Sequence, residues 1–284
     1  MTRSAMPTSL AEAVELLRAD PELRPVAGCT DLMVAEPEDR ADLPAVIDLL
    51  ALPELRGIRE TNAGLTLGAT TTFTAVRTDA RVRRDYPALA QAASEIGGWQ
   101  IQNRATLGGN VANASPAGDS LPVLLALEAT VLVAGPEGER RIAYSDFHTG
   151  YRRTALRPGE LLVAFELPAP PPGSRQGFRK VGTRAAQAIS KVVVCSLAAV
   201  EDGRFTTFRL AAGSVAAVPT RMVDVEREIV GRPADPETAE LAGRLAAAAV
   251  EPIDDVRSTA DYRRFALERV VRRCTLESAH PGAG

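Results

Sequence analysis

The residues best suited to chemistry lie in one glycine-rich stretch, Thr106 to Pro122, which reads TLGGNVANASPAGDSLP. Gly108 and Gly109 have no Cβ, so the backbone there can adopt positive φ and approach another molecule closely. Successive N–H groups in such a turn form an anion-binding concavity. Side chains suited to hydroxyl and amide partners follow: Asn110, Asn113, Ser115 and Asp119. The stretch predicts a site for a phosphate-bearing cofactor.

A second stretch decides between that site and a plain turn, which a Gly-Gly-Asn string more often marks. Residues 26–32 read VAGCTDL, another turn of small residues directly after apolar ones. Two such turns could grip one dinucleotide from two sides, with backbone N–H groups of Gly28–Leu32 and Thr106–Gly109 on the pyrophosphate and a hydroxyl from Thr30. The sequence contains no Gly-x-Gly-x-x-Gly and no Walker A motif, so a dinucleotide here is not bound in Rossmann fashion.

Lysine is almost absent from the chain. Of 33 basic residues only two are lysine, Lys180 and Lys191, and both fall in one segment. A position that keeps lysine in an arginine-rich protein is one where a compact ammonium is needed and a guanidinium fork does not replace it. Chance explains two residues about equally well, so composition alone leaves both explanations open.

Composition excludes several classes of protein. At 284 residues the chain is long enough for two domains. A net charge of −3 argues against nucleic acid or an anionic membrane as a partner, and no apolar run approaches the roughly 20 residues that span a bilayer. The three cysteines are scattered, at Cys29, Cys195 and Cys274, without a Cys-x-x-Cys pair. We therefore expect a cytoplasmic protein with free thiols and no metal site.

The expected strands cluster as hairpins rather than alternating singly with helices, which predicts an α+β fold. Hairpin turns are predicted at 62–64 and 135–138, and 168–174, PAPPPGS, is the clearest linker. A helix is expected over 87–96, ended by Gly97 and Gly98. Beyond the linker we expect strands at 189–200 and 205–214, then helices near 236–249 and 259–277.

These segments resemble the FAD-binding (medium) subunit of the molybdenum hydroxylases, the xanthine dehydrogenase and carbon monoxide dehydrogenase enzymes. PVAGCTDLMV resembles the family's first FAD-binding loop, and QIQNRATLGGNVANASPAGDSLPVLLALEATV its second. DFHTGYRRTALRPGELLVAFELP and GFRKVGTRAAQAISKVVV resemble the strands beside the flavin. LAAGSVAAVPTRMVDVEREIVGR and DDVRSTADYRRFALERVVRRC resemble the C-terminal domain.

The resemblance implies a fold and a set of domains. Residues 1–170 would form an FAD-binding domain of the PCMH type, shared with vanillyl-alcohol oxidase, made of two α+β subdomains. Residues 175–284 would form a small α+β domain of the CO dehydrogenase flavoprotein C-terminal type. The cofactor-binding residues carried over are Ala27, Gly28, Cys29, Thr30, Asp31, Leu32, Thr106, Leu107, Gly108, Gly109, Asn110, Asn113, Ser115, Asp119, Leu161, Leu162 and Lys180.

The resemblance gives some of these residues a role. Asp119 would accept from hydroxyls on the ribose and adenylate side, although it also precedes Leu121–Ala126, a helix that it could cap. Lys180 is the candidate catalytic residue, because positive charge stabilises a reduced flavin and raises its potential. Leu161 or Leu162 would cover the isoalloxazine. Ile96 would cover its other face, although a core isoleucine at the end of a helix explains this residue at least as well.

Two positions depart from the family pattern. Cys29 stands where a second glycine is usual, and a left-handed backbone there would cost cysteine about 1 kcal/mol or more; we expect instead a backbone that tolerates a side chain. His148 stands where phenylalanine is frequent, and we expect a solvated loop histidine.

The implied function is electron transfer. FAD would take electrons from the iron–sulfur clusters of a 2Fe-2S small subunit, beside a molybdopterin-binding large subunit, and pass them to an acceptor such as NAD+. The form of the first loop favours the xanthine dehydrogenase branch. Two alternatives are a free-standing FAD-dependent reductase or oxidase of the same fold superfamily and a non-catalytic nucleotide-binding module.

Overall fold

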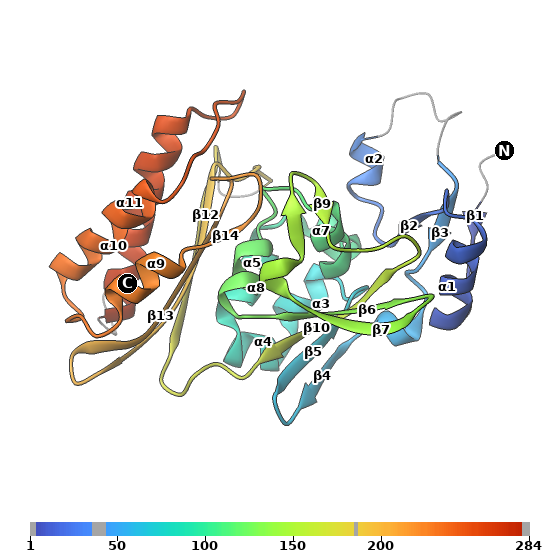
Figure 1. The fold of residues 1–284 in the computed structure, drawn as a ribbon, viewed down its shortest axis with the longest axis horizontal. Coiled ribbons are helices and arrows are strands. Elements are labelled where there is room, and N and C mark those ends of the chain that lie inside the picture. Colours follow the sequence, from blue (N-terminus) through green and yellow to red (C-terminus); the bar gives the residue numbers. More distant parts are fainter. Residues whose placement is uncertain (1–3, 36–43, 185–186, 280–284) are drawn as a thin grey trace.

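The structure is a computed structural model that describes residues 4–35, 44–184 and 187–279. Along the chain it builds a small N-terminal unit, a central unit of helices on an antiparallel sheet, and a C-terminal sheet covered by three helices (Figure 1). No helix in these ranges is long and apolar enough to cross a membrane.

The N-terminal unit carries a parallel sheet in the order β1-β3-β2. Its elements are β1 (Ser4–Ala5), α1 (Leu10–Ala19), β2 (Arg24–Val26), α2 (Leu32–Ala35) and β3 (Val46–Asp48). Ser9 caps α1 by accepting from the backbone N–H of Glu12. Val14 and Leu17 lie three positions apart on one helix face and pack into a core with Ile47. Strand β2 pairs with β3, which carries Ile47 of this core. The position at which β2 ends, directly before Ala27, is therefore fixed.

The central unit places six short helices beside an antiparallel sheet in the order β4-β5-β10-β6-β7. The sheet strands are β4 (Ile58–Thr61), β5 (Gly64–Gly68), β6 (Thr130–Gly135), β7 (Gly138–Ala143) and β10 (Leu161–Pro168). The helices are α3 (Phe73–Thr78), α4 (Ala80–Asp85), α5 (Pro87–Glu95), α6 (Trp99–Arg104), α7 (Leu107–Asn113) and α8 (Leu121–Ala126). Short 3-10 turns occupy Pro53–Leu55 and Tyr144–Asp146, and β8 (His148–Gly150) pairs with β9 (Arg153–Thr154).

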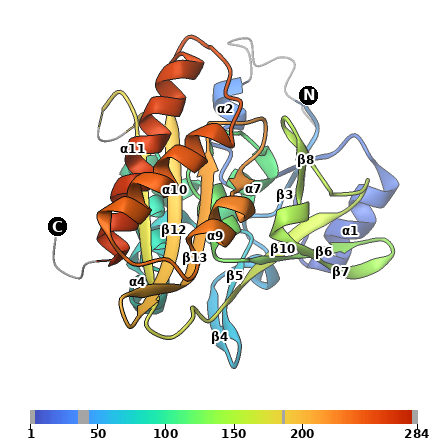
Figure 2. The same cartoon turned by 60° about the vertical axis from the view of Figure 1, so that its left-hand side comes forward.

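The C-terminal unit is an antiparallel sheet in the order β11-β12-β13-β14. Its elements are β11 (Arg175–Val181), β12 (Val192–Glu201), β13 (Arg204–Gly213), β14 (Thr220–Arg221), α9 (Val223–Ile229), α10 (Pro236–Ala248) and α11 (Ala260–Ala279). In Figure 2, α10 and α11 lie in front of β12 and β13.

Strand β12 is buried on both faces, and its alternation divides the cores. Val193 and Cys195 join the core of the central unit, whereas Val192 and Val194 pack with α10 and α11. The C-terminal sheet is therefore joined to the central helices through one continuous core, with α5 and α8 against its inner face.

The predicted α+β class, the two hairpins, the strands after the linker and the last two helices are confirmed. The interpretation of Thr106–Pro122 as a loop is wrong, because α7 and α8 occupy most of it. Gly108 is not at positive φ. A Cβ on Gly108 would lie 2.7 Å from the carbonyl oxygen of Ala69, so this glycine permits close packing of α7 against the residue that follows β5.

Candidate cofactor site

A groove with a cavity of about 390 Å³ lies where the turn after β2 meets α7, within the range usual for ligand sites. Both predicted stretches line it. The first contributes Ala27, Gly28, Cys29, Thr30, Asp31 and Leu32, and the second contributes Thr106, Gly109, Asn110 and Asn113. The structure therefore brings together two segments that are about 80 positions apart in the sequence.

The first turn has an unusual backbone. Cys29 lies at φ 59°, so the expectation of an ordinary backbone at this position is wrong. A Cβ on Gly28 would lie 2.1 Å from the carbonyl oxygen of Arg104, which only glycine avoids. Within the described residues, no hydrogen bond occupies the backbone N–H groups of Gly28, Cys29, Thr30 and Asp31. A run of free amides around a left-handed residue is the arrangement of an anion-binding nest.

Replacing Cys29 by glycine is expected to raise the free energy of unfolding by about 0.5–1 kcal/mol, because it removes the strain of a Cβ at positive φ. Chemical denaturation measures the change. Cys29→Ala is the matched control, since it removes the thiol and keeps the Cβ. An equal gain in both variants would assign the effect to the thiol instead.

The second stretch uses its amides differently from the prediction. Leu107 N donates to the Thr71 carbonyl at 2.9 Å, and Gly108 N donates to the Ala69 carbonyl at 2.8 Å. Gly109 N donates to the Thr106 hydroxyl, which caps α7. The proposed role of these three amides on a pyrophosphate is therefore wrong, because all three already have partners inside the protein.

The side chains of α7 remain as donors. Asn110 Oδ1 accepts from Ser120 Oγ at 2.7 Å, and Asn113 Oδ1 accepts from Arg152 at 3.1 Å. With the oxygens so placed, both side-chain nitrogens lack a partner among the described residues and belong to residues that line the groove. Ser115 lies outside the groove lining, and its hydroxyl accepts from the backbone of Ala117 at 3.4 Å.

Asp119 and Lys180 form a buried ion pair with 2.6 Å between Oδ2 and Nζ. Their side chains are 8 % and 5 % exposed, and Lys180 Nζ also donates to the Glu95 carbonyl at 3.2 Å. Asp119 Oδ1 is buried without a partner among the described residues. Burial raises the pKa of Asp119 to about 6, and Lys180 opposes that rise. The alternative of a helix cap is wrong, because Ser120 precedes α8 and no side chain caps it.

Asp119 and Lys180 are both predicted to bind the cofactor, but they contact each other and lie outside the groove. Neither Asp119 nor Lys180 lines the cavity. Their contact crosses from the segment before α8 to β11, and therefore from the central unit to the C-terminal sheet. Oδ2 of Asp119 already accepts from Lys180, so Oδ1 is the carboxylate oxygen of Asp119 that remains for a ligand.

The apolar residues divide. Leu161 and Leu162 are buried in two different cores and do not line the groove, so the expectation that either covers a bound ring lacks support from the groove. Ile96 does line it. Sequence reasoning missed Phe73 and Ile101, which also line the groove. The only feature of Phe73 and Ile101 visible in the sequence is that each is an apolar residue in a segment that forms a short helix, α3 or α6.

His148 is not a solvated loop residue. It begins β8, its Nε2 lies 3.1 Å from the Val111 carbonyl, and its ring meets Tyr144 and Phe147 edge-on. Burial lowers the pKa of His148 below its ordinary value. The imidazole is therefore half-buried against Tyr144 and Phe147 and contacts α7 at Val111.

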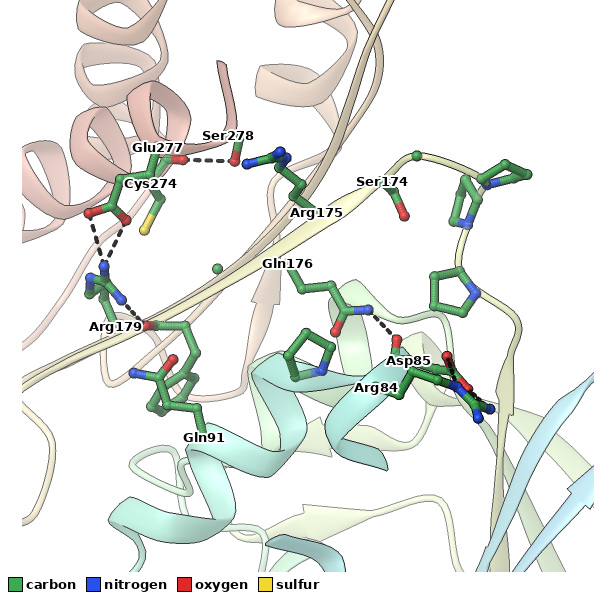
Figure 3. A pocket seen from close by; sticks show the side chains of 17 residues that line it. Arg84, Asp85, Gln91, Ser174, Arg175, Gln176, Arg179, Cys274, Glu277 and Ser278 are labelled. Carbon is green, nitrogen blue, oxygen red and sulfur yellow. Dashed lines mark hydrogen bonds and ion pairs between the residues drawn. The ribbon is translucent and has the colours of Figure 1, made fainter. Parts of the chain in front are cut away.

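A second cavity of about 610 Å³ lies beside the 170–174 linker, between α5, β11 and the end of α11 (Figure 3). Figure 3 shows Arg179 directed at Glu277, with 2.8 Å between their charged atoms, and Gln176 donating to the Asp85 carbonyl. None of the predicted site residues lines it. Its charged groups are largely paired already, so the groove at Gly28 is the better candidate for a cofactor.

Within the described ranges, no group of three or more His, Cys, Asp and Glu side chains is placed to hold a metal ion. Cys195 and Cys274 are buried free thiols. Burial raises the pKa of the Cys195 thiol well above its ordinary value and that of the Cys274 thiol to about 12. Both thiols are therefore kept neutral inside the cores.

Comparison with known proteins identifies the class. Residues 1–170 match the family described as the FAD binding domain in molybdopterin dehydrogenase, and residues 177–278 match the CO dehydrogenase flavoprotein C-terminal domain. The chain belongs to the FAD-binding subunits of the molybdenum hydroxylase family, and its cofactor is FAD.

Three relatives define how close the match is. The xanthine dehydrogenase FAD-binding subunit of Escherichia coli O157:H7 is 32% identical over 97% of this chain and 95% of its own length. The carbon monoxide dehydrogenase medium chain of Afipia carboxidovorans is 32% identical over 94% and 93%. The solved carbon monoxide dehydrogenase from Hydrogenophaga pseudoflava superposes with a TM-score of 0.92 at 29% identity, over 98% of this chain and 96% of that one.

The residues present fit FAD. The Gly28 turn offers a run of unpaired amides for a phosphate, α7 offers side-chain donors, and the buried Oδ1 of Asp119 lacks a partner among the described residues. The fit rests on a left-handed turn and close backbone packing rather than on a glycine-rich loop at residues 106–109.

Proposed function

We propose that this chain carries electrons within a xanthine dehydrogenase-like complex, from a 2Fe-2S small subunit through FAD to NAD+ or another acceptor. A molybdopterin-binding large subunit is the proposed source of the electrons, and the cytoplasm is the proposed location. Support for the class comes from the two family matches, which together extend over residues 1–278 with a gap of six positions. The choice of xanthine rests on the AGxTDL form of residues 27–32 alone.

The observation that carries the cofactor assignment is the groove itself. We propose that the free amides of Gly28–Asp31 bind the pyrophosphate, and that Thr106, Asn110 and Asn113 supply side-chain contacts on the opposite wall. Leu32, Ala27 and Gly109 would contribute surface, because they line the same groove. FAD, when bound, supplies a redox centre that accepts two electrons and can release them as hydride.

We propose that Asp119 binds the cofactor and that Lys180 tunes its potential, and the ion pair between them assigns each Asp119 oxygen a different partner. Oδ1 of Asp119 would accept a hydrogen bond from a hydroxyl of the cofactor, while Oδ2 keeps Lys180 in place. Lys180 contributes positive charge at the boundary between the central unit and β11, which favours the reduced, more negative cofactor. Leu161 and Leu162 lie within the cores and act through packing.

The proposal predicts a yellow protein with non-covalently bound FAD. Cys29 is the one cysteine in the groove lining, and burial together with Asp48 raises the pKa of its thiol, which disfavours a thiolate that could attach to flavin. Denaturation followed by chromatography should release intact FAD. Flavin that stays on the denatured chain would contradict this. A protein that remains colourless after incubation with FAD would favour the non-catalytic module.

A further inference from the structure

One motif of the C-terminal domain has no part in the site described so far. Residues 254–264 read DDVRSTADYRR and lead into α11. Asp255 Oδ1 accepts from the backbone N–H groups of Arg257 at 2.9 Å and Ser258 at 3.0 Å. The same oxygen accepts from Arg263 Nη2 at 2.8 Å. The turn thus fixes a carboxylate that holds one end of the Arg263 guanidinium.

Arg263 is buried although it is charged, with 3% of the residue exposed. Its Nη1 donates to the Lys191 carbonyl at 2.7 Å and to the Ser214 carbonyl at 2.9 Å. Lys191 directly precedes β12 and Ser214 directly follows β13. A planar guanidinium can bridge two carbonyls and a carboxylate at once, and a lysine cannot.

Ser214 passes this connection to the central unit. It lies at φ 65°, a strained conformation for serine, and its N–H donates to the Pro116 carbonyl at 2.8 Å. Its hydroxyl donates to the Ser190 carbonyl at 3.0 Å and lies 2.9 Å from Ser190 Oγ. Ser190 Oγ in turn donates to the Ala117 carbonyl at 3.0 Å.

The contacts form one continuous path. It runs from Asp255 through Arg263 to Ser214 and Ser190, and ends on the carbonyls of residues 116 and 117. Two positions later the chain places Asp119 beside Lys180. The C-terminal helix is therefore connected, through one ion pair and a series of hydrogen bonds, to the segment of the central unit that carries Asp119.

We propose that Arg263 is a positioning residue for the cofactor: it fixes the 116–119 segment through Ser214 and Ser190 and so aims Asp119. The proposal rests on the proposed role of Asp119 in binding FAD. It gives the DDVRSTADYRR motif a function in the flavin site, although Arg263 lies in a different domain from the groove.

The test measures FAD affinity in apoprotein prepared from wild type and from Arg263→Gln, by quenching of flavin fluorescence. We expect about tenfold weaker binding or more, as for other side chains that orient a ligating group. Arg264→Gln is the matched control, because Arg264 is the next residue on α11, its side chain is 42% exposed, and its two contacts, 3.4 Å to the Val250 carbonyl and 3.6 Å to Asp261, lie outside the path. It should bind FAD like wild type.

A second control separates positioning from stability. Leu267 is fully buried on α11 in the core against the C-terminal sheet, so Leu267→Ala destabilises the same helix without touching the path. Conversely, Ser214→Gly relieves the positive-φ strain and removes the hydroxyl. We expect Ser214→Gly to weaken FAD binding and Leu267→Ala to leave it nearly unchanged. The opposite pattern would overturn the proposal, and Ser214→Gly keeps the test valid if Arg263→Gln does not fold.

The decisive readout is a double-mutant cycle with Asp119→Asn. If Arg263 acts through Asp119, the double variant should have about the same affinity for FAD as the single variant that binds FAD less tightly. If the loss of FAD affinity in the double variant equals the product of the two single losses, the proposal is wrong. The cycle is also separable from the proposed function: if wild type binds no FAD, the function fails, whereas FAD binding that is unaffected by Arg263→Gln refutes only the positioning role.

Discussion

Lys180→Met is expected to lower the free energy of unfolding of the cofactor-free protein by about 3–5 kcal/mol, because it leaves a buried carboxylate without its partner. Asp119→Ala should cost a similar amount, since it leaves a buried ammonium with only the Glu95 carbonyl. The double variant should cost less than either single change, because no buried charge remains. Urea denaturation of the four proteins measures the three differences.

The matched control is an ion pair at the surface. Arg157 and Glu137 lie 2.9 Å apart with side chains 59% and 84% exposed, and the same cycle there should give about 1 kcal/mol or less. If the Asp119–Lys180 cycle gives a coupling no larger than this control, the pair is not the buried contact that its exposure indicates.

The same variants report on the cofactor. Asp119→Ala should weaken FAD binding by roughly 1.5–3 kcal/mol through loss of a charged acceptor, and Lys180→Met should lower the flavin potential more than it weakens binding. Lys180→Arg should not restore the potential, because the longer, planar guanidinium does not fit a site where Nζ lies 2.6 Å from a buried carboxylate. A wild-type potential in Lys180→Arg would refute the requirement for a compact ammonium.

Sequence patterns were sufficient where local chemistry decides the structure. Gly138 at φ 102° closes the β6–β7 turn, as the spacing of Gly135 and Gly138 predicts. The predicted strands at 189–200 and 205–214 match β12 and β13, and the proline-rich segment at 168–174 separates β10 from β11. In each case the signal and its structural cause lie within a few residues of each other.

The errors arose where distant segments decide. Gly108 is a glycine because Ala69, directly after β5, lies against it, and Gly28 because the Arg104 carbonyl lies against it. Neither neighbour is visible from the local sequence, so both glycines suggested loops. Cys29 was expected to have an ordinary backbone, but its left-handed turn leaves four amides free within the described residues. Strain at this position is consistent with a ligand-binding role.

Pairings across domains were equally out of reach. The sequence assigns Asp119 and Lys180 each to a cofactor, and it does not show that these residues, 61 positions apart, contact each other. The C-terminal motif gave a resemblance but no role, because Arg263 acts on carbonyls of Lys191 and Ser214 that no sequence spacing relates to it. The sequence therefore indicates which residues belong to the site, and only the fold shows which of them contact each other.

The purified polypeptide, supplied with FAD, xanthine and NAD+, is expected to give no steady production of NADH. Hydroxylation in this class of enzyme requires a molybdenum centre and iron–sulfur clusters that deliver electrons to FAD. The donor set for such clusters is missing from the described residues, where Cys195 and Cys274 are buried in cores and Cys29 lies alone in the groove. The protein should still support a half-reaction in which its FAD exchanges electrons with NADH or an artificial dye.

The assay follows NADH by its absorbance, with an artificial dye and NADH as the positive control for a functional flavin. On the proposed function, adding the proposed large and small subunits should start steady turnover, because the large subunit would oxidise the substrate and the small subunit would carry electrons to the groove at Gly28. Substrates other than xanthine should be tested in the same reconstituted mixture, since the relatives at 32% identity are named for xanthine and for carbon monoxide. Steady turnover of xanthine by this polypeptide alone would remove the electron-transfer proposal and favour a free-standing enzyme with its own substrate pocket.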